Sequence, residues 1–359
     1  MTSTHGSPRR TRRALRLTLV ALIAAVTASA QSAPRAVTYP GRVMGTFANV
    51  TIVTADSVAS APLAALAHAT LRRVDSLMSN WSTTSEVARL NRVAGLGPTQ
   101  VEPEVALVID SSLTVAAGSD GAFDITVEPL VRLWGFIGGP RRVPSEAEIR
   151  ATLPRVGVRH VRYDRAARTR AFDRDSVRID LGGIAKGYAV ERAARDLAAA
   201  GVTNALVNLT GNMQALGAPP GAAAWRIGIR DPRDRMPYFA KLTISNEGIS
   251  TSGQYEQFIA ANGRTYGHIL NPRTGWPVDG LISVTVVSPS AFTCDAWDTP
   301  CFVLGLERAK QLAKRRADLG VVLVQPGTGG VDTVWVESNL RSRFTLDPAA
   351  DSLFRVKYF

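Results

Sequence analysis

The spacing of apolar side chains predicts alternating strands and helices in the first third of the chain. Residues 42–54 alternate apolar and polar positions in a β-rich composition, which predicts a strand. Residues 57–79 carry apolar side chains three and four positions apart, as one face of a helix does. Capping residues before 86–90 predict a short helix there, and the pattern at 104–117 predicts an amphipathic helix that ends at Gly118.

The rest of the chain groups short strands between helices. One helix is expected to end at Gly201. Two further helices are expected to begin near Cys294 and near Glu307. Asn262 and Gly263 form a strong hairpin signal between two strands. The predicted strands are 161–163, 177–179, 205–209, 225–229, 239–244, 255–259, 265–270 and 281–287, with two more near Val321 and Val334. Because the strands pair locally, we expect an α+β fold with largely antiparallel mixed sheets packed with helices.

The N-terminal 30 residues have the pattern of an export signal. Five arginines and no acidic residue precede an apolar run at 17–26, and Ala28, Ser29 and Ala30 supply a small-x-small cleavage pattern. Paired arginines before the apolar run are also typical of a twin-arginine signal, so the Sec and twin-arginine routes both remain open. There is no cysteine near the cleavage point, so we expect a soluble, exported, periplasmic protein without a lipid anchor.

Composition narrows the class of protein further. After the leader there is no apolar run of about 18 residues, so we expect no transmembrane segment in the mature chain. The predicted domain organisation is an export signal at 1–30, a linker at 31–40, one catalytic domain at 41–340 and a C-terminal tail at 341–359.

The net charge of the chain does not indicate a nucleic-acid-binding protein. Five of the twelve excess positive charges lie in the leader, and the others are interleaved with acids, so nucleic-acid binding is not expected.

A double-glycine segment is the first candidate for chemistry. Asp180 ends a β-rich stretch, Gly182 and Gly183 follow, and a predicted helix begins near Lys186. The free N–H groups of a helix start attract phosphate, and a lysine in the first turn adds positive charge. The glycines are equally compatible with a turn chosen for tight packing.

A late acidic segment is the second candidate. Asp295, Asp298 and Thr299 are spaced so that their oxygen atoms share one face of a helical turn. Oxygen ligands without histidine favour magnesium or calcium over zinc. The alternative is a helix start whose acids complement the helix dipole.

A histidine and several aromatic residues complete the candidates. His268 ends a predicted strand beside a Pro/Gly turn, a common place for functional groups. Four aromatic residues lie in polar, loop-like surroundings where a flat ligand could stack, although most such residues belong to a core. They are Trp81, Phe123, Trp134 and Phe136.

Taken together and in this order, these segments resemble the ApbE family, the FAD:protein FMN transferases. The matching pieces are 44–46, 79–91, 121–126, 129–131, 133–136, 180–188, 267–275 and 295–305. The resemblance implies a T-fold-like architecture and an enzyme that uses Mg²⁺ and FAD to move FMN onto a Thr or Ser hydroxyl of an exported or membrane-bound acceptor protein, with release of AMP.

The resemblance also assigns residues. The metal would be held by Asp295, Asp298, Thr299 and the backbone carbonyl of Gly183. The FAD contacts would be Met44, Trp81, Ala122, Phe123, Asp124, Asp180, Lys186, His268 and Ile269. The candidate general base is His268, with Asp295 or Asp298 as alternatives.

The chain departs from the family pattern in a few places. Trp81 stands where tyrosine is frequent, Glu128 where glycine is usual, and Thr210 where a glycine is common. Cys294 and Cys301 are expected to be two buried thiols. Two further functions suit the same pocket: hydrolysis of FAD to FMN and AMP, and non-catalytic binding or storage of FAD.

Overall fold

The computed structural model describes residues 1–3, 33–164 and 169–359. Nearly all of the predicted export signal at 1–30 and the first two residues of the predicted linker lie outside these ranges. Residues 33–359 form one compact unit. Within the described ranges there is no helix with the length and apolar content that a membrane span requires.

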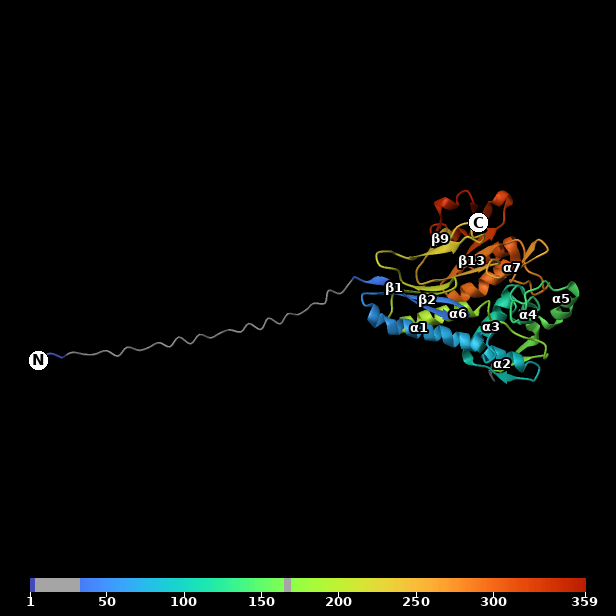
Figure 1. Cartoon of the computed structure of the whole chain (residues 1–359), viewed down its shortest axis with the longest axis horizontal. Coiled ribbons are helices and arrows are strands. Elements are labelled where there is room, and N and C mark those ends of the chain that lie inside the picture. Colours follow the sequence, from blue (N-terminus) through green and yellow to red (C-terminus); the bar gives the residue numbers. More distant parts are fainter. Residues whose placement is uncertain (4–32, 165–168) are drawn as a thin grey trace. The chain divides into compact units, whose positions relative to one another are not determined.

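A nine-stranded sheet forms the centre of this unit (Figure 1). Its strands follow the order β1-β2-β6-β7-β10-β13-β14-β15-β17, and each neighbouring pair is antiparallel except β15 and β17. The strands are β1 (Arg35–Val43), β2 (Thr46–Thr54), β6 (Ala205–Leu209), β7 (Asn212–Leu216), β10 (Gly248–Gly253), β13 (Ser283–Ser288), β14 (Gly320–Gln325), β15 (Asp332–Val336) and β17 (Phe354–Tyr358).

Three small sheets surround the central one. Their strand orders are β16-β9-β8, β3-β5-β4 and the hairpin β11-β12, in which Asn262 and Gly263 form the predicted turn. Their strands are β3 (Thr99–Gln100), β4 (Val161–Asp164), β5 (Thr169–Phe172), β8 (Trp225–Arg230), β9 (Tyr238–Ile244), β11 (Phe258–Ala261), β12 (Arg264–Gly267) and β16 (Phe344–Leu346).

Helices cover one face of the central sheet, and the β16-β9-β8 sheet covers the other. The main hydrophobic core joins the sheet to α1, α3, α6 and α7, and a second core lies between the sheet and β8 and β9. Figure 1 shows α1 and α6 on the side opposite β9. The helices are α1 (Ser57–Met78), α2 (Glu86–Arg92), α3 (Pro103–Gly118), α4 (Glu128–Leu133), α5 (Glu146–Thr152), α6 (Ala185–Ala199) and α7 (Ala291–Arg315). The expected α+β class with mostly antiparallel sheets is thereby confirmed.

The helix boundaries follow from local chemistry. The Asp56 side chain caps α1 by accepting from two backbone N–H groups, and the Ser85 hydroxyl caps α2 by accepting from the N–H of Ala88. Gly305, at a φ of 74°, divides α7 into two helical parts, which accounts for the two separate helices predicted there.

Two predictions about strands are wrong. Residues 177–179 form no strand, because Val177 and Ile179 are fully buried and the backbone of Ile179 is held by the side chains of Asn80 and Asn91. The predicted linker at 31–40 is strand from Arg35 onward. β1 is an edge strand, where a proline such as Pro40 is tolerated better than in a central strand. In the predicted tail, β16 and β17 complete two of the sheets.

The start of α7 is packed against two glycines. A Cβ atom on Gly187 of α6 would overlap the carbonyl oxygen of Ala291 and lie 2.5 Å from the Cβ of Asp295. A Cβ on Gly248 of β10 would overlap the backbone of the same Ala291. These contacts bring the backbones of α6, α7 and β10 close together.

We expect Gly187→Ala to destabilise the protein by about 1–3 kcal/mol, because the added methyl group must push α6 away from α7. The measurement is the free energy of unfolding by chemical denaturation. Gly139→Ala is the matched control, since a Cβ there meets nothing within 4 Å. Equal stability of both variants would contradict the tight packing.

Candidate functional site

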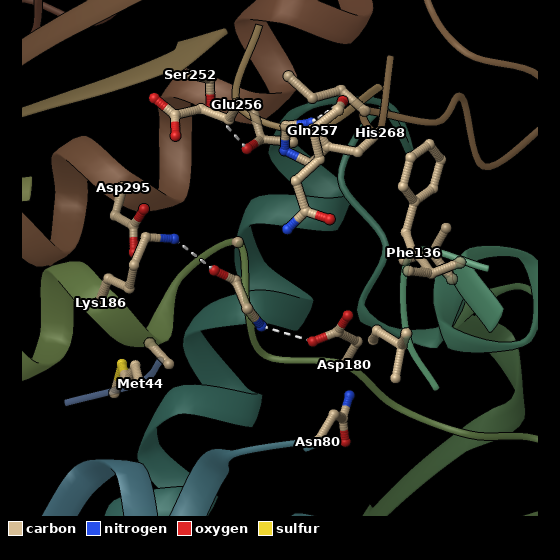
Figure 2. A pocket seen from close by; sticks show the side chains of 18 of the residues that line it. Met44, Asn80, Phe136, Asp180, Lys186, Ser252, Glu256, Gln257, His268 and Asp295 are labelled. Atoms are coloured by element: carbon tan, nitrogen blue, oxygen red, sulfur yellow. Dashed lines mark hydrogen bonds between the residues drawn. The ribbon is translucent and has the colours of Figure 1, made fainter. Parts of the chain in front are cut away.

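All thirteen residues assigned to FAD or metal from the sequence line one cavity of about 490 Å³. They come from segments far apart in the chain, and Figure 2 shows how several of their side chains point toward a common space. They are Met44, Trp81, Ala122, Phe123, Asp124, Asp180, Gly183, Lys186, His268, Ile269, Asp295, Asp298 and Thr299.

Two buried carboxylates and a hydroxyl form one wall of the cavity. Asp295 and Asp298 are 3% and 1% exposed. The Oδ2 atom of Asp295 accepts from the backbone N–H of Gly187 at 2.7 Å. The Oδ2 atom of Asp298 accepts from the hydroxyl of Ser250 at 2.5 Å, and its Oδ1 lies 3.2 Å from the hydroxyl oxygen of Thr299. The three side chains therefore lie on one face of α7, as their spacing predicts.

The double-glycine segment lies directly against this wall. A Cβ atom on Gly183 would lie 3.3 Å from the ring of Phe123 and 3.7 Å from the hydroxyl oxygen of Thr299. A side chain at position 183 would therefore fill the space between the backbone and the α7 oxygen atoms. The segments around 183 and 299 meet although more than a hundred residues separate them.

The electrostatics of this wall fit a divalent cation. Burial, followed by the nearby charge of Asp295, raises the pKa of Asp298 to about 7, and burial raises the pKa of Asp295 as well. A cation between the two carboxylates would compensate both effects. Among the described residues there is no cluster of three or more His, Cys, Asp or Glu side chains arranged for a metal. The oxygen groups at this wall are two carboxylates, a hydroxyl and a backbone carbonyl. They suit Mg²⁺, which typically binds one or two protein carboxylates and completes its coordination shell with substrate phosphates.

The whole cavity is rich in carboxylates. Six acidic side chains line it, and Lys186 is the only lysine or arginine among the described residues that line it. Two of the acids, Asp75 and Glu256, were not singled out from the sequence. The six are Asp75, Asp124, Asp180, Glu256, Asp295 and Asp298.

Asp180 and Lys186 are connected through the glycine turn (Figure 2). The Nζ atom of Lys186 donates to the carbonyl of Gly182 at 2.9 Å, and the N–H of Gly182 donates to Oδ1 of Asp180 at 2.8 Å. Burial raises the pKa of Asp180, while this hydrogen bond and the charge of Lys186 oppose the rise. The turn thus holds a lysine and a carboxylate at fixed positions on the cavity wall.

His268 lies on the same cavity as a neutral base. Its Nδ1 atom is 3.2 Å from the carbonyl oxygen of Gln257, which can only accept, so Nδ1 carries the proton and Nε2 keeps its lone pair. Burial lowers the pKa of His268 to about 4. The ring of Phe136 packs edge-on against it, with the ring centroids 6.2 Å apart.

The aromatic candidates divide into two groups. Trp81, Phe123 and Phe136 line the cavity, and Trp81 is 69% exposed, so its ring is free to stack on a flat ligand. Trp134 does not line it. Its ring is fully buried and its N–H donates to the carbonyl of Gly275, so Trp134 follows the second alternative left open by the sequence, a place in the core. Cys294 and Cys301 are free and buried, as expected.

Two turns at the cavity adopt left-handed backbone conformations. Met44 has a φ of 51° and Thr210 a φ of 49°, a region that favours glycine. The hydroxyl groups of Thr46 and Thr210 lie within hydrogen-bond distance of each other, which links the two turns. The left-handed backbone at Thr210 is therefore a physical reason for the glycine that is common at this position in the family pattern.

Sequence reasoning left several lining residues without a role. Asn80 lies within the matching segment 79–91, and Ser252 lies between two predicted strands, but neither was assigned a contact. Ser252 lies 3.2 Å from the hydroxyl oxygen of Thr299, and Asn80 donates to the carbonyl of Ile179. Gln257 could not be recognised from its residue type, because it contributes to the site through its backbone carbonyl and not through its side chain.

Comparison with known proteins gives a consistent result. The family model described as the ApbE family matches residues 44–323. The chain is 33% identical over 306 residues to the FAD:protein FMN transferase of Salmonella typhimurium, with 83% of this chain and 87% of that protein covered. It is 34% identical over 310 residues to the protein of the same name from Escherichia coli K12, covering 84% and 87%.

Solved structures show the same likeness. The flavin transferase ApbE from Vibrio cholerae superposes with a TM-score of 0.77 at 28% identity, covering 86% of this chain and 99% of that one. The apo form of the Pseudomonas stutzeri flavinyl transferase ApbE gives a TM-score of 0.74 at 31% identity, covering 89% and 97%. With a family match over most of its length and relatives this similar, the chain belongs to the ApbE family.

Proposed function

We propose that this chain is an FAD:protein FMN transferase that moves FMN from FAD to a Thr or Ser hydroxyl of an acceptor protein, requires Mg²⁺ and releases AMP. The family membership and the names of its relatives support flavin transfer. The observation that carries the finer proposal is the meeting of Gly183 with the oxygen atoms of α7 beside Lys186, in one cavity. Such a site suits a diphosphate bound together with a divalent cation.

The charge of the cavity supports the proposed requirement for a cation. A diphosphate is an anion, and the six lining carboxylates would repel it. When bound by Asp295, Asp298, Thr299 and the carbonyl of Gly183, Mg²⁺ would supply positive charge at the diphosphate and stabilise the departing AMP. Lys186 adds a second positive charge from the first turn of α6.

The remaining residues would bind the flavin and handle the proton. Trp81 offers an exposed ring for stacking, and Phe123 forms part of the wall beside Gly183. The acceptor hydroxyl must lose a proton as its oxygen attacks phosphorus. The lone pair on Nε2 of His268 can accept that proton, because the ring is held neutral and its other nitrogen is bound to a carbonyl.

We also propose that the protein is exported to the periplasm. The basic and apolar pattern of residues 1–30 and the small residues at 28–30 support this. The acceptor would then be an exported or membrane-bound protein.

Transfer is tested by incubating the full chain with FAD, Mg²⁺ and a pool of synthetic peptides that each carry one central threonine. We expect peptide masses increased by FMN, together with AMP release that depends on peptide. AMP release at the same rate without peptide, and no adduct, would instead show a pyrophosphatase. Binding of FAD with no AMP under any condition would show a storage protein.

Asp298→Asn should lower Mg²⁺-dependent transfer by about a hundredfold or more, because it removes a negative ligand while keeping the shape of the side chain. The measurement is the AMP release rate across a Mg²⁺ titration, with circular dichroism as the check on folding. Asp351→Asn, at an exposed position, is the control and should match the unaltered protein. Unchanged Mg²⁺ dependence would remove Asp298 from the metal site.

His268→Gln should lower the turnover number by roughly 10²- to 10⁴-fold and leave FAD affinity nearly unchanged, as expected on loss of a general base. The imidazole should titrate near pH 4 by NMR, so it accepts a proton at neutral pH and loses this ability as the pH falls through about 4. A ring that titrates near its ordinary value, or a variant defective mainly in FAD binding, would contradict this role.

A further inference from the structure

A second cavity adjoins the one described above. Its volume is about 520 Å³, and Asn80 lines both cavities. Its walls come from the segment before α2, from α2 itself, from α4 and from the stretch around 176–178. The shared residue shows that the two cavities adjoin each other at Asn80.

The second cavity is basic. Four arginines line it, Arg92, Arg132, Arg155 and Arg178, and we call this set the arginine groove. Its only acidic lining residue is Glu128, which forms an ion pair with Arg132 at 2.6 Å. Glu128 is also the residue that stands where the family usually has glycine.

Three of the four arginines have no carboxylate partner among the described residues, so no nearby acid neutralises their positive charge. Arg92 and Arg178 donate to backbone carbonyls, which are neutral acceptors. Within the described ranges, neither of them nor Arg155 forms an ion pair with a carboxylate. Guanidinium groups left in this state are suited to carboxylate ligands, which they bind through two parallel hydrogen bonds.

The two neighbouring cavities carry opposite charge. The first has six carboxylates and one lysine, and the second has four arginines and one carboxylate. An acidic polypeptide is therefore repelled from the first cavity and attracted to the second. A neutral hydroxyl can enter the first cavity while acidic neighbours stay in the second.

We propose that the arginine groove docks acidic residues that flank the modified Thr or Ser of the acceptor protein, and so orients its hydroxyl toward the cavity that holds FAD. This inference rests on the proposed function. The groove would add acceptor specificity that the transfer of FMN to a hydroxyl does not itself supply. Its effect depends on charge, so it weakens as ionic strength rises.

The test uses two labelled synthetic peptides, each with a central threonine, flanked by aspartates in one and by asparagines in the other. Fluorescence anisotropy with the full chain should show tighter binding of the aspartate peptide. Arg155→Glu should weaken that binding by roughly tenfold or more and leave the asparagine peptide unaffected. Arg226→Glu is the control: this exposed arginine lines neither cavity and should change nothing.

Three results would overturn the proposal: equal binding of the two peptides, no effect of Arg155→Glu, or loss of FAD affinity in that variant, measured by flavin fluorescence. Displacement of the aspartate peptide by low concentrations of inorganic phosphate would also overturn it, because the groove would then be a small-anion site. Failure of the proposed function is separate: it would appear as charge-dependent peptide binding without any FMN transfer by the unaltered chain.

Discussion

The site depends on the close approach of α6 and α7. Gly187 and Gly248 have no side chains where the start of α7 passes, so the backbones of α6, α7 and β10 come together. That approach lets the N–H of Gly187 bind the carboxylate of Asp295. The same packing brings Gly183, just before α6, against Thr299, one helical turn after Asp295. Without it, Gly183 and the oxygen atoms of Asp295, Asp298 and Thr299 would lie apart.

Burial sets the chemistry of the groups that this packing brings together. It raises the pKa of Asp298 to about 7 and lowers that of His268 to about 4, so the protein alone disfavours charge at both positions. Under the proposed function, a divalent cation would stabilise the ionised carboxylates, whereas the histidine would act as a neutral base. Burial around one cavity would then serve both metal binding and proton removal.

The two adjoining cavities carry opposite charge, six carboxylates with one lysine in the first and four arginines with one carboxylate in the second. Under the two proposals, the acidic cavity would take a dinucleotide together with a cation, and the arginine groove would take acidic chain segments. Asn80 lies between them and also holds the backbone of Ile179, next to Asp180. The wall between the cavities is therefore fixed by side-chain hydrogen bonds to an irregular segment and not by a sheet.

The sequence by itself determined what depends on neighbouring residues: helices such as α1, the cap at Ser85, the hairpin turn at 262–263 and the motif residues that line the cavity. Tertiary structure decided the rest. It made 177–179 a buried irregular segment, turned the predicted linker into an edge strand, and placed Trp134 in a core. The reason is physical: local periodicity records which side chains are apolar, but pairing, desolvation and convergence of distant segments depend on contacts that no short stretch of sequence contains.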